Sequence, residues 1–245
     1  MLLQVHFLPS HVSQESLGGV VVVIDQLRAS STIVAALAAG ASGIVPCLTT
    51  NDALEVRQRL GETVLLGGER HGKLIEGFDL GNSPLEYTPE KVRGRVIAFT
   101  TTNGTRALLH SANAAQVIIG CLNNQSAVAT AAARFAVQLK CDLHLLCAGT
   151  GGVVCMDDVL AAGAIAESVT RRADIRLSDT AMIAVRAFRD ASATGLDRAM
   201  AEAIGGRNLV EIGMAADVTE CTRQDIRPLV PLLSASEPVI RVLRE

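Results

Sequence analysis

Residues 20–39 read V-V-V-V-I-D-Q-L-R-A-S-S-T-I-V-A-A-L-A-A, and this stretch decides the predicted fold. Its first five residues are all β-branched and aliphatic, which is typical of a buried strand. We therefore predict a strand over Val20–Asp25. A helix is predicted over Ser30–Ala39, because Ser30 or Ser31 can cap its first turn. A buried strand that leads directly into a helix is the repeating unit of proteins with a parallel sheet.

The same alternation recurs along the chain. Six further strands are predicted over Leu2–Leu8, Gly43–Leu48, Val64–Gly67, Arg95–Thr100, Gln116–Cys121 and Asp142–Cys147. Four further helices are predicted over Asn51–Leu60, Asn103–Ser111, Gln125–Leu139 and Met156–Arg171. The pattern indicates an α/β protein of three layers, with a mainly parallel, mixed sheet and helices on both of its faces.

The last third of the chain is predicted to be mostly helical. The helical pattern runs from Ser178 to Gly213, with breaks expected at Asp190–Gly195 and at Gly205-Gly206. A final extended segment, Val230–Val242, is expected to return to the edge of the sheet. No linker or repeat marks a boundary, so residues 1–245 are expected to form one domain.

One long segment, Gly68–Gly94, fits neither a strand nor a helix. A loop of this length inside a compact domain is normally either functional or disordered. Its glycines and its varied composition favour a functional loop.

Composition excludes several classes of protein. Hydrophobic residues make up 49% of the chain and charged residues 19%, which is unlike a disordered or highly basic protein. With five Phe, one Tyr and no Trp, the chain also lacks the aromatic side chains on which single-stranded nucleic acids stack. No signal peptide and no apolar run of about 18 residues is present, so we expect a cytoplasmic protein without nucleic-acid or membrane partners. The six cysteines lack C-x-x-C spacing and are expected to be reduced core residues.

Three predicted strand-to-helix junctions carry most of the unusual polar residues. Such junctions meet at the carboxyl ends of parallel strands, where ligands bind. In the first, Asp25 ends a buried strand and Arg28 follows. These two residues could form a structural ion pair. Equally, Asp25 could be a metal ligand and Arg28 could bind an anion.

The second junction, F-T-T-T-N-G-T-R-A-L at residues 99–108, resembles an anion site. Hydroxyl groups, exposed backbone N–H groups and the positive end of a helix can together surround an anion, and Arg106 can clamp it. The alternative is an ordinary helix cap with a solvated arginine. Four successive polar donors exceed what capping requires, so we favour the anion site. The glycine motifs of ATP and dinucleotide sites are absent.

The third junction, L-L-C-A-G-T-G-G-V-V-C-M-D-D-V-L-A-A-G at residues 145–163, places Asp157 and Asp158 at the start of a helix. Acidic residues in a first turn often only complement the helix dipole. Together with Asp25 and Glu69 they also provide the oxygen ligands that Mg²⁺ prefers. His71, in the long segment, is either a general acid or an ordinary surface histidine.

Five stretches of the sequence are distinctive when taken together: V-I-D-Q-L-R-A-S-S-T, G-G-E-R-x-G-x-x-x-x-G-F-D-L-G-N-S-P, F-T-T-T-N-G-T-R-A, D-D-V-L-A-A-G and G-M-A-A-D-V-T-E-C-T-R-Q-D-I-x-x-L-V-P-L. In this order they resemble the 2-phosphosulfolactate phosphatase family. The resemblance implies an α/β enzyme that uses Mg²⁺ to hydrolyse 2-phosphosulfolactate to sulfolactate and phosphate, a step of coenzyme M biosynthesis. The characteristic positions of the family fall on Asp25, Arg28, Ser30, Glu69, Asn82, Ser83, Thr102, Asn103, Gly104, Arg106 and Asp158. The family has Glu-Asp where this chain has Asp157-Asp158, and the shorter Asp157 reaches less far.

From the chemistry of these residues we predict a site for a small, anionic, phosphorylated substrate. Asp158 and Asp25 are expected to hold Mg²⁺, with Glu69 a third ligand or the base that positions water, and Arg28 neutralises the phosphoryl group. The second anionic group is expected to bind Ser30, Asn82, Ser83, Thr101, Thr102, Asn103, Gly104 and Arg106.

Three alternatives stay open. Asp25 could act as a nucleophile through an aspartyl-phosphate. The enzyme could hydrolyse another small phosphorylated acid. The chain could also be a non-catalytic, regulatory anion-binding protein. A homodimer is compatible with all of them.

Overall fold

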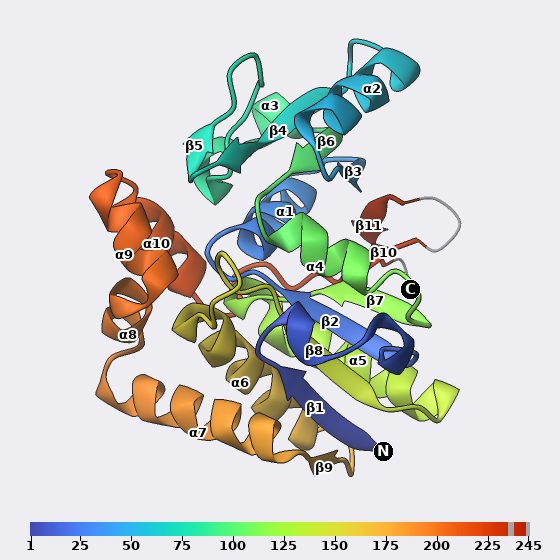
Figure 1. Ribbon diagram of the computed structural model, residues 1–245, viewed down its shortest axis with the longest axis vertical. Helices are drawn as coiled ribbons and strands as arrows, with labels where there is room; N and C mark the ends of the chain where they lie inside the picture. The colour runs from blue at the N-terminus through green and yellow to red at the C-terminus, as the bar shows by residue number, and fades with distance from the viewer. Residues whose placement is uncertain (235–237, 244–245) are drawn as a thin grey trace.

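The computed structural model describes residues 1–234 and 238–243, and within these ranges eleven strands form one mixed sheet (Figure 1). The strands are β1 (Leu2–His6), β2 (Val20–Ile24), β3 (Gly43–Pro46), β4 (Leu65–Arg70), β5 (Lys73–Leu74), β6 (Val96–Thr100), β7 (Gln116–Ile119), β8 (Leu143–Cys147), β9 (Arg176–Leu177), β10 (Pro231–Leu233) and β11 (Ile240–Val242). Their order across the sheet is β5-β4-β6-β3-β11-β10-β7-β2-β8-β1-β9. The predicted α/β class is confirmed.

The helices follow the predicted alternation closely. They are α1 (Ala29–Ala38), α2 (Thr50–Leu60), α3 (Pro89–Val92), α4 (Gly104–His110), α5 (Gln125–Leu139), α6 (Met156–Thr170), α7 (Asp179–Thr194), α8 (Leu196–Glu202), α9 (Ile204–Glu211) and α10 (Ala215–Thr222). Short 3₁₀ helices lie at Pro9–His11, Gln14–Ser16, Pro84–Glu86 and Leu122–Asn124. None of the helices in the described ranges is long and apolar enough to cross a bilayer.

Strand β2 shows why the chain forms three layers. All five of its residues are buried, as expected for a strand that is covered on both faces. Val20, Val22 and Ile24 pack into a core cluster with α5, α6 and α7. Val21 and Val23 point the other way, into a cluster with α1 and α4. Successive side chains alternate between the faces of a strand, so this apolar run serves both layers.

The end of the chain lies within the sheet, which corrects the prediction that Val230–Val242 returns to its edge. Strands β10 and β11 are antiparallel to each other and lie between β7 and β3. They join two groups of parallel strands, β3-β6-β4 on one side and β7-β2-β8-β1 on the other. Residues 235–237 of this segment lie outside the described residues.

The C-terminal helices are confirmed, but one predicted break is wrong. Helix α7 continues to Thr194 and ends at Gly195, whose φ is 130°. The next break falls at Ala203, and Gly205-Gly206 lies inside the first turn of α9. A Cβ atom on Gly206 would stand 2.0 Å from the carbonyl oxygen of Met200. This glycine therefore permits close packing of α8 and α9 and does not end a helix.

The long segment Gly68–Gly94 is largely ordered into short elements, in contrast to the predicted loop. Strand β4 continues through Gly68 to Arg70, and β5 pairs with it after a tight turn. The 3₁₀ helix Pro84–Glu86 and helix α3 follow. The segment thus brings Glu69 and Asn82 to fixed positions, which a flexible loop would not do.

The cysteines are unpaired thiols, as predicted. All except the half-buried Cys141 are buried. Burial raises the pKa of Cys155, which precedes α6, to about 12. This thiol is therefore unreactive near neutral pH.

Candidate active site

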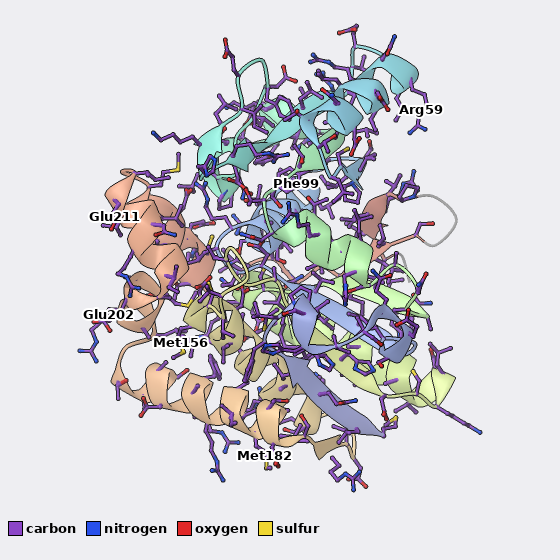
Figure 2. All side chains as sticks on the ribbon, viewed as in Figure 1. Arg59, Phe99, Met156, Met182, Glu202 and Glu211 are labelled. Atoms are coloured by element: carbon purple, nitrogen blue, oxygen red, sulfur yellow. The ribbon has the colours of Figure 1, made fainter. Side chains whose placement is uncertain are left out.

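A cleft of about 530 Å³ lies where β2, β4, β6 and β8 end, the edge at which ligands bind in α/β proteins. Its lining consists of Asp25, Leu27, Arg28, Glu69, His71, Gly72, Asn82, Thr101, Thr102, Asn103, Thr150, Gly151, Gly205, Asn208, Leu209, Glu211 and Ile212. Glu211 marks the end of α9 in Figure 2, so this helix forms one wall. The polar lining makes this cleft the candidate active site.

A larger groove of about 880 Å³ lies along the β10–β11 hairpin and the start of β7. Its lining is mostly apolar, and no Asp, Glu or His is among the lining residues that the structure describes. It lacks the titratable side chains that hydrolysis requires, so we assign the chemistry to the smaller cleft.

The structure brings seven of the twelve predicted site residues to the cleft. These are Asp25, Arg28, Glu69, Asn82, Thr101, Thr102 and Asn103. The other five, all within the described part of the chain, do not line it: Ser30, Ser83, Gly104, Arg106 and Asp158.

Asp25 stands at the end of β2, with its backbone held by Ser30. The Asp25 N–H donates to Oγ of Ser30 at 2.9 Å, and the Ser30 N–H donates to the Asp25 carbonyl at 2.8 Å. One carboxylate oxygen of Asp25, Oδ1, accepts a hydrogen bond from the Ala29 N–H at 3.1 Å. Ser30 therefore shapes the turn that presents Asp25, and its hydroxyl does not face the cleft.

Gly104 makes room for the Asp25 carboxylate. A Cβ atom at position 104 would stand 2.8 Å from Oδ2 of Asp25 and 2.7 Å from Cβ of Ala29. Because both distances are below normal contact, only glycine fits without displacing a neighbour. The glycine of the predicted anion site thus leaves space for Oδ2 of Asp25.

Burial raises the pKa of three carboxyl groups at the junctions after β2 and β8, namely Asp25, Asp157 and Asp158. Burial raises the pKa of Asp25 to about 7, with further contributions from the negative charges of Asp157 and Glu69. Burial likewise raises the pKa of Asp157 to about 6. The pKa of Asp158 lies well above its usual range because of burial and of the charges of Asp157 and Asp25. Such a concentration of buried carboxyl groups is typical of a functional site.

Asp158 does not line the cleft, and its carboxylate connects the loop after β2 to the loop after β8. Its Oδ1 accepts a hydrogen bond from the Gln26 N–H and its Oδ2 one from the Gly149 N–H, both at 2.8 Å. Both oxygens are thus occupied by backbone donors. This geometry supports a role in holding the loops after β2 and β8, and it does not support the predicted direct contact with a metal.

Glu69 connects the turn after β4 to the junction after β6. Its Oε1 accepts a hydrogen bond from the Thr102 N–H at 2.8 Å, and its Oε2 accepts one from the Gly72 N–H at 2.7 Å. The residue is only 7% exposed. Its position is therefore fixed before any ligand enters.

The predicted anion site after β6 is only partly available. The Thr101 N–H donates to Oγ1 of Thr105 at 3.1 Å, and the Thr102 N–H is already used by Glu69. Oδ1 of Asn103 accepts a hydrogen bond from the Gly151 N–H at 3.2 Å. Arg106 is exposed on α4 and does not line the cleft, so a clamp from this arginine is not supported.

In the Asn82-Ser83 turn, Asn82 lines the cleft, whereas Ser83 binds a residue outside it. Oδ1 of Asn82 is buried and has no hydrogen-bond partner among the described residues. The Ser83 hydroxyl instead donates to Oδ1 of Asp217 at 2.6 Å. Only Asn82 is free to bind a ligand.

Arg28 is buried at 3% exposure and is held by three partners. Its Nη1 donates to Oδ2 of Asp217 at 2.5 Å and contacts Sδ of Met214 at 2.7 Å. Its Nη2 donates to the Gly72 carbonyl at 2.8 Å. A guanidinium has five N–H groups, so two of them have no partner in the described structure and can bind a ligand oxygen.

Sequence reasoning missed Asp217 and the wall formed by α9. Asp217 belongs to the G-M-A-A-D-V-T-E run, which carried the resemblance without suggesting a role for this residue. Its burial inside a short helix was the only further signal, and the burial of one acidic residue cannot be predicted from a single sequence. Asn208 and Ile212 of α9 carry no motif at all.

Comparison with known proteins agrees with the resemblance drawn from the motifs. The family model described as 2-phosphosulpholactate phosphatase matches residues 6–236. A protein of Caldanaerobacter subterraneus subsp. tengcongensis named "Probable 2-phosphosulfolactate phosphatase" is 43% identical over 214 residues, 87% of each chain. Proteins with the same name from Symbiobacterium thermophilum and Deinococcus radiodurans are each 39% identical, and they cover 93% and 98% of this chain and 97% and 96% of their own. The chain therefore belongs to the 2-phosphosulfolactate phosphatase family.

Proposed function

We propose that this protein is a Mg²⁺-dependent phosphatase that hydrolyses 2-phosphosulfolactate to sulfolactate and inorganic phosphate. The observation that carries the proposal is the position of Asp25 in the cleft, beside Arg28 and Glu69. The names of the relatives provide the substrate. If 2-phosphosulfolactate is the substrate, the reaction is the step of coenzyme M biosynthesis that the resemblance implies, and we propose this role for the chain.

The oxygen atoms near Asp25 fit a Mg²⁺ ion that has few protein ligands. Oδ2 of Asp25 accepts no hydrogen bond within the described structure, and Oδ1 of Asn82 is buried without a partner there. The described residues contain no group of three or more His, Cys, Asp or Glu that could hold a metal ion. Mg²⁺ commonly keeps several waters and takes one or two carboxylates together with substrate phosphate oxygens. We therefore assign the ion to Asp25 and Asn82, with Glu69 close by.

The charges in the cleft explain why a cation is needed. Asp25, Glu69 and Glu211 are acidic, whereas Arg28 is the only arginine or lysine among the lining residues that the structure describes. A phosphorylated sulfonic acid would meet net repulsion in such a cleft. A bound Mg²⁺ neutralises both the carboxylates and the phosphoryl oxygens, which lowers the barrier to attack at phosphorus.

Hydrolysis then requires positioning and one proton transfer. Arg28 binds a phosphoryl oxygen through its two remaining N–H groups. A water molecule attacks phosphorus, and the bond from phosphorus to the ester oxygen breaks with its electron pair on that oxygen. Glu69, whose orientation is fixed by two amides, accepts a proton from the attacking water. The ester oxygen takes up this proton from Glu69 and becomes the hydroxyl of sulfolactate, so one proton moves from the water to the leaving group.

The polar side chains after β6 are assigned to the far end of the substrate. Thr102 and Asn103 line the cleft next to Glu69, where they can donate hydrogen bonds to the sulfonate or the carboxylate. Among the described residues, Asn103 forms a side-chain hydrogen bond only through its oxygen, to the Gly151 N–H, so its NH₂ group is available to a ligand.

A phosphate-release assay with purified protein tests the proposal. The substrates are 2-phosphosulfolactate, 2-phospholactate and 3-phosphoglycerate, each with Mg²⁺ or with EDTA. We expect release from 2-phosphosulfolactate that stops in EDTA and is slower with the two carboxylic analogues. Preference for an analogue would identify the enzyme as a phosphatase of another small acid. No release with any substrate would contradict the proposal and favour a non-catalytic anion-binding protein.

The same assay, stopped with acid, separates two mechanisms. If Oδ2 of Asp25 attacks phosphorus itself, mass analysis finds a phosphate on Asp25 during turnover. The direct attack of water predicts no such adduct.

A further inference from the structure

We propose that Asp217 is a positioning residue, which orients Arg28 and the Asn82-Ser83 turn for catalysis from outside the cleft. The inference rests on the proposed phosphatase function. Asp217 lies in α10, is 3% exposed and does not line the cleft.

The Asp217 carboxylate binds two different segments of chain. Oδ2 lies 2.5 Å from Nη1 of Arg28, in an ion pair whose side chains are almost fully buried. Oδ1 accepts a hydrogen bond from the Ser83 hydroxyl at 2.6 Å. Met214, which directly precedes α10, places its sulfur 2.7 Å from the same Nη1 atom. Helix α10 and its start therefore hold both the guanidinium and the residue after Asn82.

The hydrogen bonds continue from Arg28 across the cleft. Nη2 of Arg28 donates to the Gly72 carbonyl, the Gly72 N–H donates to Oε2 of Glu69, and Oε1 of Glu69 accepts from the Thr102 N–H. One connected path thus joins Asp217 to the segments after β2, β4 and β6. Each of these segments contributes lining residues.

This arrangement favours a role in orientation over a role in charge. Pairing with Asp217 reduces the positive potential that Arg28 presents to an anion, which by itself weakens binding. What the pair provides is a fixed guanidinium plane, which leaves two N–H groups for the phosphoryl oxygens. Errors of about 1 Å in the position of such a group can cost about 100-fold in rate.

Two substitutions separate orientation from charge. In Asp217→Asn the amide oxygen can still accept from Arg28, and the amide NH₂ can donate to the Ser83 hydroxyl, which is able to accept. Asp217→Ala removes both contacts. We expect kcat/KM to fall about 100-fold in Asp217→Ala. In Asp217→Asn it should stay within about 10-fold of the wild type.

Glu220→Gln is a matched control on the same helix. Glu220 pairs with Arg223 and Arg227, which do not line the cleft. We expect this variant to lower the melting temperature without changing kcat or KM per folded molecule. A purely structural role for Asp217 predicts the same behaviour for Asp217→Ala.

The experiment measures kcat and KM for phosphate release, together with the Kd for inorganic phosphate from calorimetry in the presence of Mg²⁺. We expect weaker phosphate binding in Asp217→Ala, by about 10-fold, with recovery in Asp217→Asn. Ser83→Ala, which removes one contact and leaves the ion pair, should show a smaller loss and serves if Asp217→Ala does not fold. Kinetics and phosphate affinity equal to those of the wild type in all three variants would overturn the inference. An inactive wild type would contradict the proposed function alone, because the phosphate affinities still test Asp217.

Discussion

The backbone N–H of Thr102 donates a hydrogen bond to Oε1 of Glu69 at 2.8 Å, and thereby joins two strand ends that lie 33 positions apart in the chain. The other oxygen of Glu69 accepts from the Gly72 N–H. A carboxylate held in this way by two amides is oriented without a ligand, and a water molecule or metal that meets it needs no reorganisation of the protein.

Glu69→Gln should therefore lower both activity and stability. A glutamine has one carbonyl oxygen, so it cannot accept from both amides at once. We expect kcat to fall at least about 100-fold, as is usual for a lost general base. The free energy of unfolding should fall by about 1–3 kcal/mol. Phosphate release and thermal melting measure these effects.

Glu86→Gln is the control for this prediction. Glu86 also accepts a backbone hydrogen bond, from the Gly81 N–H at 2.7 Å, but it does not line the cleft. We expect the Glu86→Gln variant to be less stable than the wild type but to have the same kcat. A Glu69→Gln variant that behaved like Glu86→Gln would contradict a catalytic role for Glu69.

Asp25→Asn should stabilise the protein in the absence of a metal. Burial and neighbouring negative charge raise the pKa of Asp25 from its ordinary 3.8 to about 7 in the folded chain. Between these two values the folded state binds more protons than the unfolded state, so this group lowers stability as the pH rises from about 4 to about 7. At pH 8 in EDTA the neutral amide should gain about 1–2 kcal/mol, which is about 2–8 °C in melting temperature for a chain of this size.

The same comparison at pH 4 provides the control, because Asp25 is then protonated in the folded state. We expect the difference between the two melting temperatures to shrink there. A variant that is less stable than the wild type at pH 8 would show that Asp25 is not an uncompensated buried charge.

Gly104→Ala should disturb Asp25 through packing. The added Cβ atom would stand 2.8 Å from Oδ2 of Asp25, so either the carboxylate or the start of α4 must move. Overpacking of this kind costs about 1–3 kcal/mol. We also expect loss of activity of about 10-fold or more, because a displaced carboxylate is misplaced for catalysis.

Gly18→Ala is a suitable companion substitution. A Cβ atom on Gly18 would meet no other atom within 4 Å. Equal melting temperatures and rates for the two alanine variants would contradict the close approach of Gly104 to Asp25.

His6 and His144 should make the protein sensitive to acid. The two rings lie on neighbouring strands, with Nε2 of His6 3.0 Å from Nδ1 of His144. Burial, and then the charge of His144, lowers the pKa of His6 from 6.5 to about 4. The unfolded state binds more protons in this range, so stability should fall as the pH drops from about 6.5 to about 4.

His6→Gln should flatten this dependence. Denaturant melts at pH 7.5 and pH 5 measure the slope, and His11→Gln, at an exposed position, serves as the control. If wild type and His6→Gln lost the same free energy of unfolding between the two pH values, the two rings would not be the source of the acid sensitivity.

The strands and helices could be predicted because their patterns are long and regular. The apolar run Val20–Ile24 predicts a buried strand and nothing else, and the predicted bounds of the helix Gln125–Leu139 are the observed ones. The middle position of β10 and β11 could not be predicted. Each is three residues long, and the place of such a strand in a sheet depends on partners distant in the chain.

The candidate site could be predicted as a region but not residue by residue. Polar residues after a strand gather at one edge of the sheet, which is why Asp25, Glu69 and Thr102 meet in the cleft. The sequence does not show which way each side chain points. Asp158 and Ser83 therefore carried the same signal as Asp25 and Asn82, although backbone amides and Asp217 occupy their oxygens.

The rate of phosphate release from 2-phosphosulfolactate by the wild type and by Asp25→Asn, both with Mg²⁺, tests the central claim most directly. We predict steady release by the wild type, abolished by EDTA, and a rate at least about 100-fold lower for the folded Asp25→Asn protein. A folded Asp25→Asn protein that released phosphate at the rate of the wild type would contradict the claim that catalysis takes place at Asp25.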